Sequence, residues 1–326
     1  MKLGRPSSAA LLAAMLAVLA ACAPAGSDVR QAGAVTPPSG SAPAPAGTIV
    51  TTLPVADKAV TMAYDGRYLW IGSDSGAVTQ VDTTIGQVIR TIKVGGRPGG
   101  IAVTGDGVWV ADGAAATVTR LDSGTGQAGA TVRVGAGPTG LAQVGGDLWV
   151  FSRSERRARV LDPRAARTTR TVALPGSGGA HPAVAGGAVW VPDQDGDGRS
   201  VWRIDPVSGR TTARVDTGGR PAEITFGFGS GWVTSSEGLT RFGPDDGRTQ
   251  ARIAGLGRQL DGITVTPDAV WVTSTVDNRL SRVDPVTNRV VASLVVCTGP
   301  RHLTVVGEDI WVVCGDTGML VRVHPG

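Results

Sequence analysis

Residues 48–326 alternate between short apolar runs and polar turns, and a Trp marks the same point in each cycle. Apolar runs this short, bounded by Gly, Pro and Asp, are typical of β-strands rather than helices. Seven Trp residues, each next to a β-branched residue, recur every 39 to 42 positions; they are Trp70, Trp109, Trp149, Trp190, Trp232, Trp271 and Trp311. A period of this length predicts a repeat architecture rather than one irregular sheet.

Each period contains four apolar segments. The Trp segment is followed about ten residues later by an apolar-x-x-apolar-Asp stretch, as from Val78 to Asp82. A turn then leads into a β-rich run such as Val88 to Val94, and a Gly/Pro loop precedes the next apolar segment. Four short strands in roughly forty residues are the signature of a propeller blade.

Residues 108–144 carry a resemblance to a known repeat. The run Val-Trp-Val-Ala-Asp at 108–112, Thr-Val-Thr-Arg-Leu-Asp at 117–122 and Val-Gly-Ala-Gly-Pro-Thr-Gly-Leu-Ala at 134–142 resembles the YVTN-type β-propeller repeat. The likeness extends over residues 48–326 and implies an all-β, seven-bladed propeller with four-stranded blades. It implies little about function, because this architecture hosts many activities.

The last period ends after its third strand, near Val323, so its outer strand must come from elsewhere. Residues 48–53 precede Lys58 as residues 87–92 precede Arg97. We therefore expect residues 48–53 to complete the seventh blade and close the ring without an unpaired edge.

The first 47 residues are predicted to be an export signal followed by a tether. Two cations before Pro6 and an apolar run from Ala9 to Ala21 predict a signal peptide over residues 1–21. The run ends Leu-Ala-Ala-Cys, which resembles the bacterial lipobox and implies lipidation of Cys22. Residues 22–47 are mostly Ala, Pro, Gly and Ser and predict a flexible tether. The chain is thus expected at the extracytoplasmic face of a cell membrane, held there by acyl chains such as palmitate alone.

The net charge argues against one class of partner. It is +4 for the whole chain and about +2 once Lys2 and Arg5 leave with the leader. A charge this small on a chain of this length does not predict nucleic-acid binding. We expect a monomer.

Cys297 and Cys314 remain after Cys22 is lipidated, an even number in an oxidising compartment. Cys297 falls at the end of the outer strand of blade six and Cys314 at the end of the second strand of blade seven. Strands two and four of a blade run the same way, so both residues should lie near one rim. A structural disulfide is expected, with two separate buried thiols as the alternative.

The Trp alignment also predicts a channel mouth. Because side chains alternate along a strand, positions seven and nine before each Trp are expected to face the axis. The position seven residues before the Trp holds small residues such as Ala102 and Ala142, which predicts an open channel. Position nine before includes His181, Glu223 and His302. The loops above it carry five cations, Lys58, Arg97, Arg220, Arg258 and Arg301, and so predict a site for a small anion. The alternative is that these cations are solvated residues beside turns.

Two metal hypotheses follow from donor residues. His181, Glu223 and His302 are zinc-type donors, although blades four, five and seven are not all neighbours, which argues against a shared ion. The segment with Asp193, Asp195 and Asp197 resembles the start of a calcium loop. Its twelfth position is Ile204 rather than Glu, and the alternative is an acidic turn. No other cofactor is expected. The Asp series Asp82, Asp122, Asp162, Asp205 and Asp284 is interpreted as turn-forming.

A binding or interaction scaffold for an envelope component, an exported protein or a small anionic molecule fits these features. The alternative is an enzyme, because the chain is more distantly similar to streptogramin B lyase-like propellers. That resemblance implies a channel-side His directly after the loop Pro, an acid and Mg²⁺. The sequence departs from it, with Gly99, Thr139, Ala222 and Arg301 at the equivalent positions.

Overall fold

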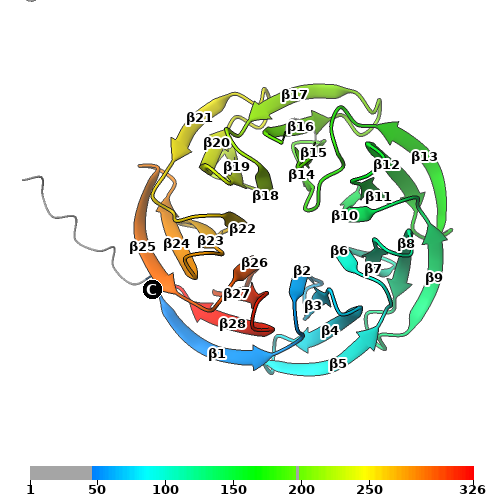
Figure 1. Cartoon of the computed structure of the whole chain (residues 1–326), viewed down its shortest axis with the longest axis horizontal. Helices are drawn as coiled ribbons and strands as arrows, with labels where there is room; N and C mark the ends of the chain where they lie inside the picture. Colours follow the sequence, from blue (N-terminus) through cyan, green and yellow to red (C-terminus); the bar gives the residue numbers. More distant parts are fainter. Residues whose placement is uncertain (1–45, 196–197) are drawn as a thin grey trace, which may run out of the picture. The chain divides into compact units, whose positions relative to one another are not determined.

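The computed structural model describes residues 46–195 and 198–326, and these residues form seven four-stranded antiparallel sheets with no helix among them. The sheets stand around a central axis as the blades of a propeller (Figure 1). The all-β, seven-bladed prediction is confirmed. Predictions for residues 1–45, including lipidation of Cys22, lie outside the described residues.

Each blade runs from an inner strand at the axis to an outer strand at the rim (Figure 1). Blades one to three comprise β2 (Ala59–Tyr64), β3 (Tyr68–Ser73), β4 (Ala77–Asp82) and β5 (Gln87–Lys93); β6 (Pro98–Thr104), β7 (Gly107–Asp112), β8 (Thr117–Leu121) and β9 (Ala128–Arg133); and β10 (Pro138–Val144), β11 (Asp147–Ser152), β12 (Arg157–Asp162) and β13 (Arg167–Ala173).

Blades four to seven follow the same order. They comprise β14 (Ala183–Ala185), β15 (Ala188–Asp193), β16 (Ser200–Ile204) and β17 (Thr211–Asp216); β18 (Pro221–Gly227), β19 (Ser230–Ser235), β20 (Gly238–Phe242) and β21 (Thr249–Ile253); β22 (Leu260–Val265), β23 (Val270–Ser274), β24 (Arg279–Asp284) and β25 (Arg289–Val295); and β26 (Pro300–Val306), β27 (Asp309–Cys314), β28 (Met319–His324) and β1 (Thr48–Pro54). The inner strand of blade four, β14, is the shortest.

The repeated Trp fills the space between neighbouring blades. All seven lie on the second strand of their blade and are buried. The apolar residue eight positions before a Trp packs against the Trp of the preceding blade, as Ile101 does against Trp70 and Leu141 against Trp109. Burying an aromatic ring of this size is among the largest contributions a residue makes to a core. The repeated Trp in the sequence therefore corresponds to a repeated contact between neighbouring blades.

The ring closes through β1. This strand pairs antiparallel with β28, from Thr48 opposite His324 to Pro54 opposite Met319, in the sheet order β1-β28-β27-β26. Leu53 packs against the cluster that contains Trp311 and Leu320. The predicted closure is confirmed.

A disulfide joins Cys297 to Cys314, as predicted. Cys314 ends β27, whereas Cys297 lies two residues beyond the end of β25 rather than within it. The bridge links the connection between blades six and seven to the closing blade.

A bulge interrupts the first residues of six of the seven inner strands. The register with the second strand shifts between Ala59 and Thr61, between Pro221 and Ile224, and between Pro300 and Leu303, with similar shifts in β6, β10 and β22. A bulge turns a side chain away from the direction that simple alternation gives it. This is where the candidate site lies.

The described residues contain no helix with the length and apolar character needed to cross a bilayer.

Candidate functional site at the channel mouth

Two cavities open among the loops that lead into the inner strands. The first mouth cavity has a volume of about 660 Å³, and Arg97, Arg153, His181 and Arg301 are among its lining residues. The second mouth cavity, about 480 Å³, is lined in part by Arg220, Asp261 and again Arg301. Both fall within the size range of small-molecule sites.

The predicted rim residues do not all meet in one place. Arg97, His181 and Arg301 line the first mouth cavity and Arg220 the second. Glu223 lies deeper, where it and His181 line an inner cavity of about 160 Å³. Arg258 lines a separate cavity beside Asp277, and Lys58 is exposed and lines none of these.

Each rim arginine is held by a carboxylate. Arg97 donates from Nε and Nη2 to Asp74, at 3.3 and 3.0 Å. Arg301 Nη1 lies 3.5 Å from Asp261 Oδ2, and Arg258 Nη2 lies 3.3 Å from Asp277 Oδ1.

Asp195 contacts one arginine from each mouth cavity, Arg153 from the first and Arg220 from the second. It accepts two hydrogen bonds from Arg153, and its Oδ1 lies 3.9 Å from Arg220 Nη2. The hydrogen bond from Arg153 is the largest cause that holds the pKa of Asp195 below its ordinary value.

The carboxylates orient the guanidinium groups but also reduce the charge of the rim as a whole. In the first mouth cavity the arginines face the open space more than their carboxylate partners do: among the described residues, Arg97, Arg153 and Arg301 line it together with Asp74, whereas Asp195 and Asp261 do not. An excess of cations on a cavity wall favours an anionic occupant.

Sequence reasoning missed a second ring of rim residues. The residue four positions after the Trp also reaches the mouth in five of the seven blades: Asp74, Gly113 and Arg153 line the first mouth cavity, and Gln194 and Ser236 the second. The same Trp alignment that gave the inner-strand ring would have found them, counted forward rather than back.

Below the mouth, His181, Glu223 and His302 form one cluster. One donor atom from each lies within 4.8 Å of the others. The two imidazole rings have centroids 4.1 Å apart. The expectation that the channel keeps these residues apart is wrong, because Glu223 and His302 sit in bulges and His181 lies on the segment between β13 and β14, which reaches toward the axis (Figure 1).

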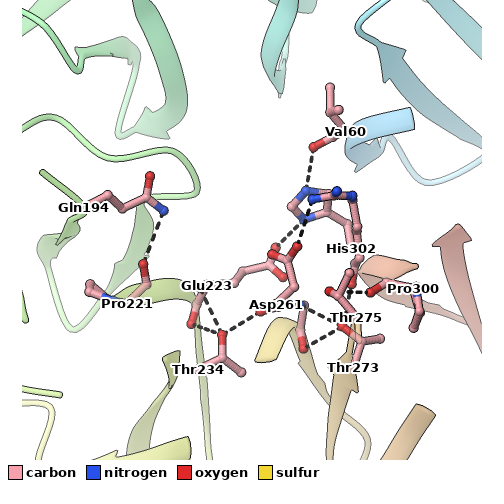
Figure 2. Close-up of polar contacts among 12 residues, drawn as sticks. Val60, Gln194, Pro221, Glu223, Thr234, Asp261, Thr273, Thr275, Pro300 and His302 are labelled. Carbon is pink, nitrogen blue, oxygen red and sulfur yellow. Dashed lines mark hydrogen bonds and ion pairs between the residues drawn. The ribbon is translucent and has the colours of Figure 1, made fainter. Parts of the chain in front are cut away.

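The hydrogen bonds of His302 and Glu223 fix their orientation (Figure 2). His302 Nε2 donates to the Val60 carbonyl oxygen at 2.6 Å, and His302 Nδ1 lies 3.3 Å from Glu223 Oε1. The other carboxylate oxygen, Glu223 Oε2, accepts from the backbone N–H of Ile263 at 3.0 Å. Residues of blades one, five, six and seven therefore meet here.

These neighbours set the protonation of the two histidines in opposite directions. Burial disfavours the charged form of His302, but the charge and hydrogen bond of Glu223 outweigh it and raise the pKa of His302 to about 9. Burial, followed by the neighbouring His302, lowers the pKa of His181 well below its ordinary value. His302 and Glu223 thus form a part-buried pair in which the charged imidazole is favoured, beside His181, whose charged form is disfavoured.

Threonines on the second strands hold the bulged backbone in place (Figure 2). Thr234 Oγ1 accepts from the N–H of Glu223 at 3.1 Å and lies 2.6 Å from the carbonyl oxygen of Asp261. Thr273 Oγ1 accepts from the N–H of Gly262 and lies 2.7 Å from the carbonyl oxygen of Arg301. A buried backbone group without such a partner would be costly, so these hydroxyls make the bulges tolerable.

The interpretation of the alternate inner-strand positions needs a correction. Ala102 and Ala142, seven before their Trp, are buried against Trp109 and Trp149 of their own blades rather than facing the axis. Neighbouring blades cover both faces of each blade. Alternation along an inner strand therefore decides which neighbouring blade a side chain contacts, and it does not point the side chain into the channel. Nine residues before Trp271, Gly262 allows the inner strands of blades six and seven to approach closely, because a Cβ there would collide with the carbonyl of Arg301.

The carboxylates of the predicted calcium segment have other partners. Asp193 is buried and accepts hydrogen bonds from the N–H and hydroxyl of Ser177. Asp195 pairs with Arg153, and Asp197 lies outside the described residues. Calcium binding stays a prediction.

The Asp series after the third strands forms turns, as interpreted. Asp82 Oδ1 accepts from Thr84, and the corresponding Oδ1 atoms accept from amides two or three residues later, those of Thr125, Ala165, Ser208 and Val286. These residues therefore belong to the scaffold and not to a site.

No known family profile matches the chain, and no curated protein sequence matches it. The YVTN-type and lyase-type resemblances therefore stay predictions. Solved structures do match. Hydrazine synthase of Kuenenia stuttgartiensis is 16% identical, with a TM-score of 0.67 over 84% of this chain and 96% of that one.

The computationally designed protein Ika8 is 12% identical, with a TM-score of 0.66 over 86% of this chain and all of that one. At such identities the likeness extends to the fold alone. The chain is a seven-bladed β-propeller whose mouth gathers arginines above a partly buried His–Glu–His cluster.

Proposed function

We propose that this chain is an envelope-anchored binding protein whose propeller takes a small anionic ligand in the first mouth cavity. The observation that carries the proposal is the cation excess on that cavity's wall, where Arg97, Arg153 and Arg301 line about 660 Å³ of space. An arginine pre-oriented by a carboxylate loses less conformational entropy when it binds, and its planar fork suits carboxylate and phosphate groups.

The pairing geometry leaves donors for a ligand. Arg97 uses Nε and Nη2 on Asp74, and among the described residues Nη1 has no further hydrogen-bond partner. Arg301 contacts Asp261 through Nη1 at the long distance of 3.5 Å, and its side chain is one-third exposed. Arg97 and Arg153 lie on loops of different blades and Arg301 lies in the bulge at the start of β26, so an anion between them would be held from several sides.

Location at the membrane rests on the sequence. The Leu-Ala-Ala-Cys run before residue 23 and the Ala/Pro/Gly/Ser segment after it support a lipid anchor on Cys22 and a tether to the propeller. Anchoring would keep the mouth near envelope polymers, exported proteins and small anions that pass the membrane surface.

One experiment with two arms tests both parts. In cells that make the chain, it should fractionate with membranes, and Cys22→Ser should release it. In vitro, isothermal titration with inorganic phosphate, pyrophosphate and citrate should detect binding of at least one anion, weakened by salt.

Arg97→Gln and Arg153→Gln should each weaken the binding of that anion about tenfold or more, because each removes a charged donor from the cavity. The matched control is Arg248→Gln, since Arg248 is exposed and lies outside both cavities. Binding that is equal in all four proteins, or absent for every anion, would contradict a site in the first mouth cavity.

A further inference from the structure

We propose that His181, Glu223 and His302 form a zinc-binding site in the channel, beneath the first mouth cavity. Two imidazoles and one carboxylate are the protein ligands of many zinc sites that keep a coordination position open. The inference does not depend on the proposed anion site, because metal binding can be measured without any other ligand.

The donor spacing suits one small ion. Two ligands on a tetrahedral zinc, each about 2.0 to 2.1 Å from the metal, stand about 3.3 Å apart. His302 Nδ1 and Glu223 Oε1 are already separated by 3.3 Å. A ring nitrogen of His181 lies within 4.8 Å of a donor atom on each of the other two residues, so movement of its side chain toward them would complete the set.

The backbone orients the two other ligands for this role. A metal-binding His normally donates its second ring N–H to a carbonyl or carboxylate, which fixes the tautomer and leaves the other nitrogen for the metal. His302 Nε2 does this with the Val60 carbonyl at 2.6 Å. Glu223 is anchored likewise through Oε2 by the N–H of Ile263 at 3.0 Å, which leaves Oε1 facing the cluster.

His181 is placed by a left-handed turn just before the inner strand. Its φ is +58°, a conformation that Lys58 and Gln259 also adopt directly before the inner strands of their blades, and Pro182 follows it. Here the turn brings an imidazole from the loop before the short strand β14 against His302.

The coordination would leave one position toward open space. His181 lines both the first mouth cavity and the inner cavity, and Glu223 lines the inner one. When zinc binds, it replaces the Nδ1 proton of the His302–Glu223 pair, and that proton passes to solvent. A water or an anion from the mouth could take the remaining position.

The test is titration of the metal-free purified chain with zinc sulfate, followed by calorimetry and by elemental analysis after gel filtration. We expect one zinc per chain. His181→Ala, Glu223→Gln and His302→Gln should each lower the affinity at least about a hundredfold, because each removes a direct ligand. His324→Ala is the matched control, since His324 is the third histidine of the chain and contacts Asp309 outside the cluster.

Two further measurements guard against misfolding. Thermal unfolding without metal shows whether a variant is folded, and His181→Ala, at a half-buried loop residue, should stay folded. Co²⁺ bound in place of zinc should give the visible absorption of a tetrahedral site, and folded His181→Ala should lose that spectrum. Absence of stoichiometric zinc in the parent chain, or zinc affinity that folded His181→Ala retains in full, would overturn the proposal.

Discussion

At the scale of single residues, the Trp that defines the repeat is matched by an Arg on the next strand. In five blades the residue opposite the Trp in the sheet is Arg: Arg120, Arg203, Arg241, Arg282 and Arg322. Four of these guanidinium groups lie 4.9 to 5.9 Å from the centre of their Trp ring. A cation over an aromatic face is attracted to it and also shields the ring from water.

Arg241 is the best connected of these residues. It lies 4.9 Å from the Trp232 ring, and it donates to Ser230 Oγ and to the Pro285 carbonyl in the turn of the next blade. Arg241→Ala should lower the free energy of unfolding by about 2 to 3 kcal/mol, from the lost stacking and charged hydrogen bonds. Urea denaturation measures this.

The matched control for Arg241 is Arg248→Ala. The Arg248 side chain is 88% exposed and has one ion pair, so its loss should change stability by less than about 0.5 kcal/mol. Equal effects of the two substitutions would show that the stacked arginines do not support the blade.

At the scale of elements, the turn after the third strand depends on an ionised Asp in five of the seven blades. The hydrogen bond from the Thr84 hydroxyl is the largest of several causes that lower the pKa of Asp82 to about 2. The Arg67 guanidinium contributes as well, through Nε and Nη2. Asp122, Asp162, Asp205 and Asp284 have pKa values shifted in the same direction, chiefly by hydrogen bonds from the N–H groups of their turns.

The lowered pKa of Asp82 determines how the free energy of unfolding changes with pH. A carboxyl whose pKa is lower in the folded state stabilises that state above the unfolded pKa, here 3.8, and the benefit is lost as pH falls toward about 2. The free energy of unfolding should therefore decline steeply over that range. Asp82→Asn should show a shallower decline, measured by chemical denaturation at a series of pH values.

Thr84→Val supplies the comparison for Asp82, because it removes the main hydrogen bond but keeps the carboxyl. Its decline should lie between those of the parent and Asp82→Asn. Three superimposable pH profiles would mean that this turn carries no acid-sensitive stability.

At the scale of the whole molecule, the ring depends on a strand from the opposite end of the sequence. β1 covers the outer edge of β28 along its whole length. Without β1, the backbone groups of β28 that face outward would lose their partners, and Leu320 would lose the packing of Leu53.

Deletion of residues 48–53 should therefore lower the midpoint of thermal unfolding by about 10 °C or more, consistent with a loss of several kcal/mol in a domain of this size. Differential scanning calorimetry measures it. Deletion of residues 34–39, six positions of the predicted tether, is the control and should leave the midpoint unchanged. A midpoint insensitive to the loss of 48–53 would show that closure contributes nothing to stability.

Much of this fold could be predicted from the sequence, because one residue type marks it. The spacing from Trp70 to Trp311 sets the number of blades, and the short seventh period requires the segment from Thr48 to close the ring. The even number of remaining cysteines and the strand directions favoured the Cys297–Cys314 bridge over two separate thiols, and the structure contains it. These inferences need only the order and polarity of strands, which the repeat conserves from blade to blade.

The site could be predicted only in part, because its side chains lie on bulges and on a loop rather than on regular strands. Simple alternation placed Glu223 and His302 at the channel, but the bulges at Pro221 and Pro300 decide where their side chains point. The reach of His181 depends on the loop before β14, which is longer than the corresponding connection in the other blades. Nor does the pattern reveal that Asp74, Asp195 and Asp261 orient the rim arginines.

The pairing of Thr48 with His324 brings Gly47 and Gly326 side by side. A short peptide joining them would make the backbone circular, and such a circle could be cut in the loop between any two blades to give a permuted chain with the same packing. The propeller architecture therefore does not determine which blade comes first in the polypeptide.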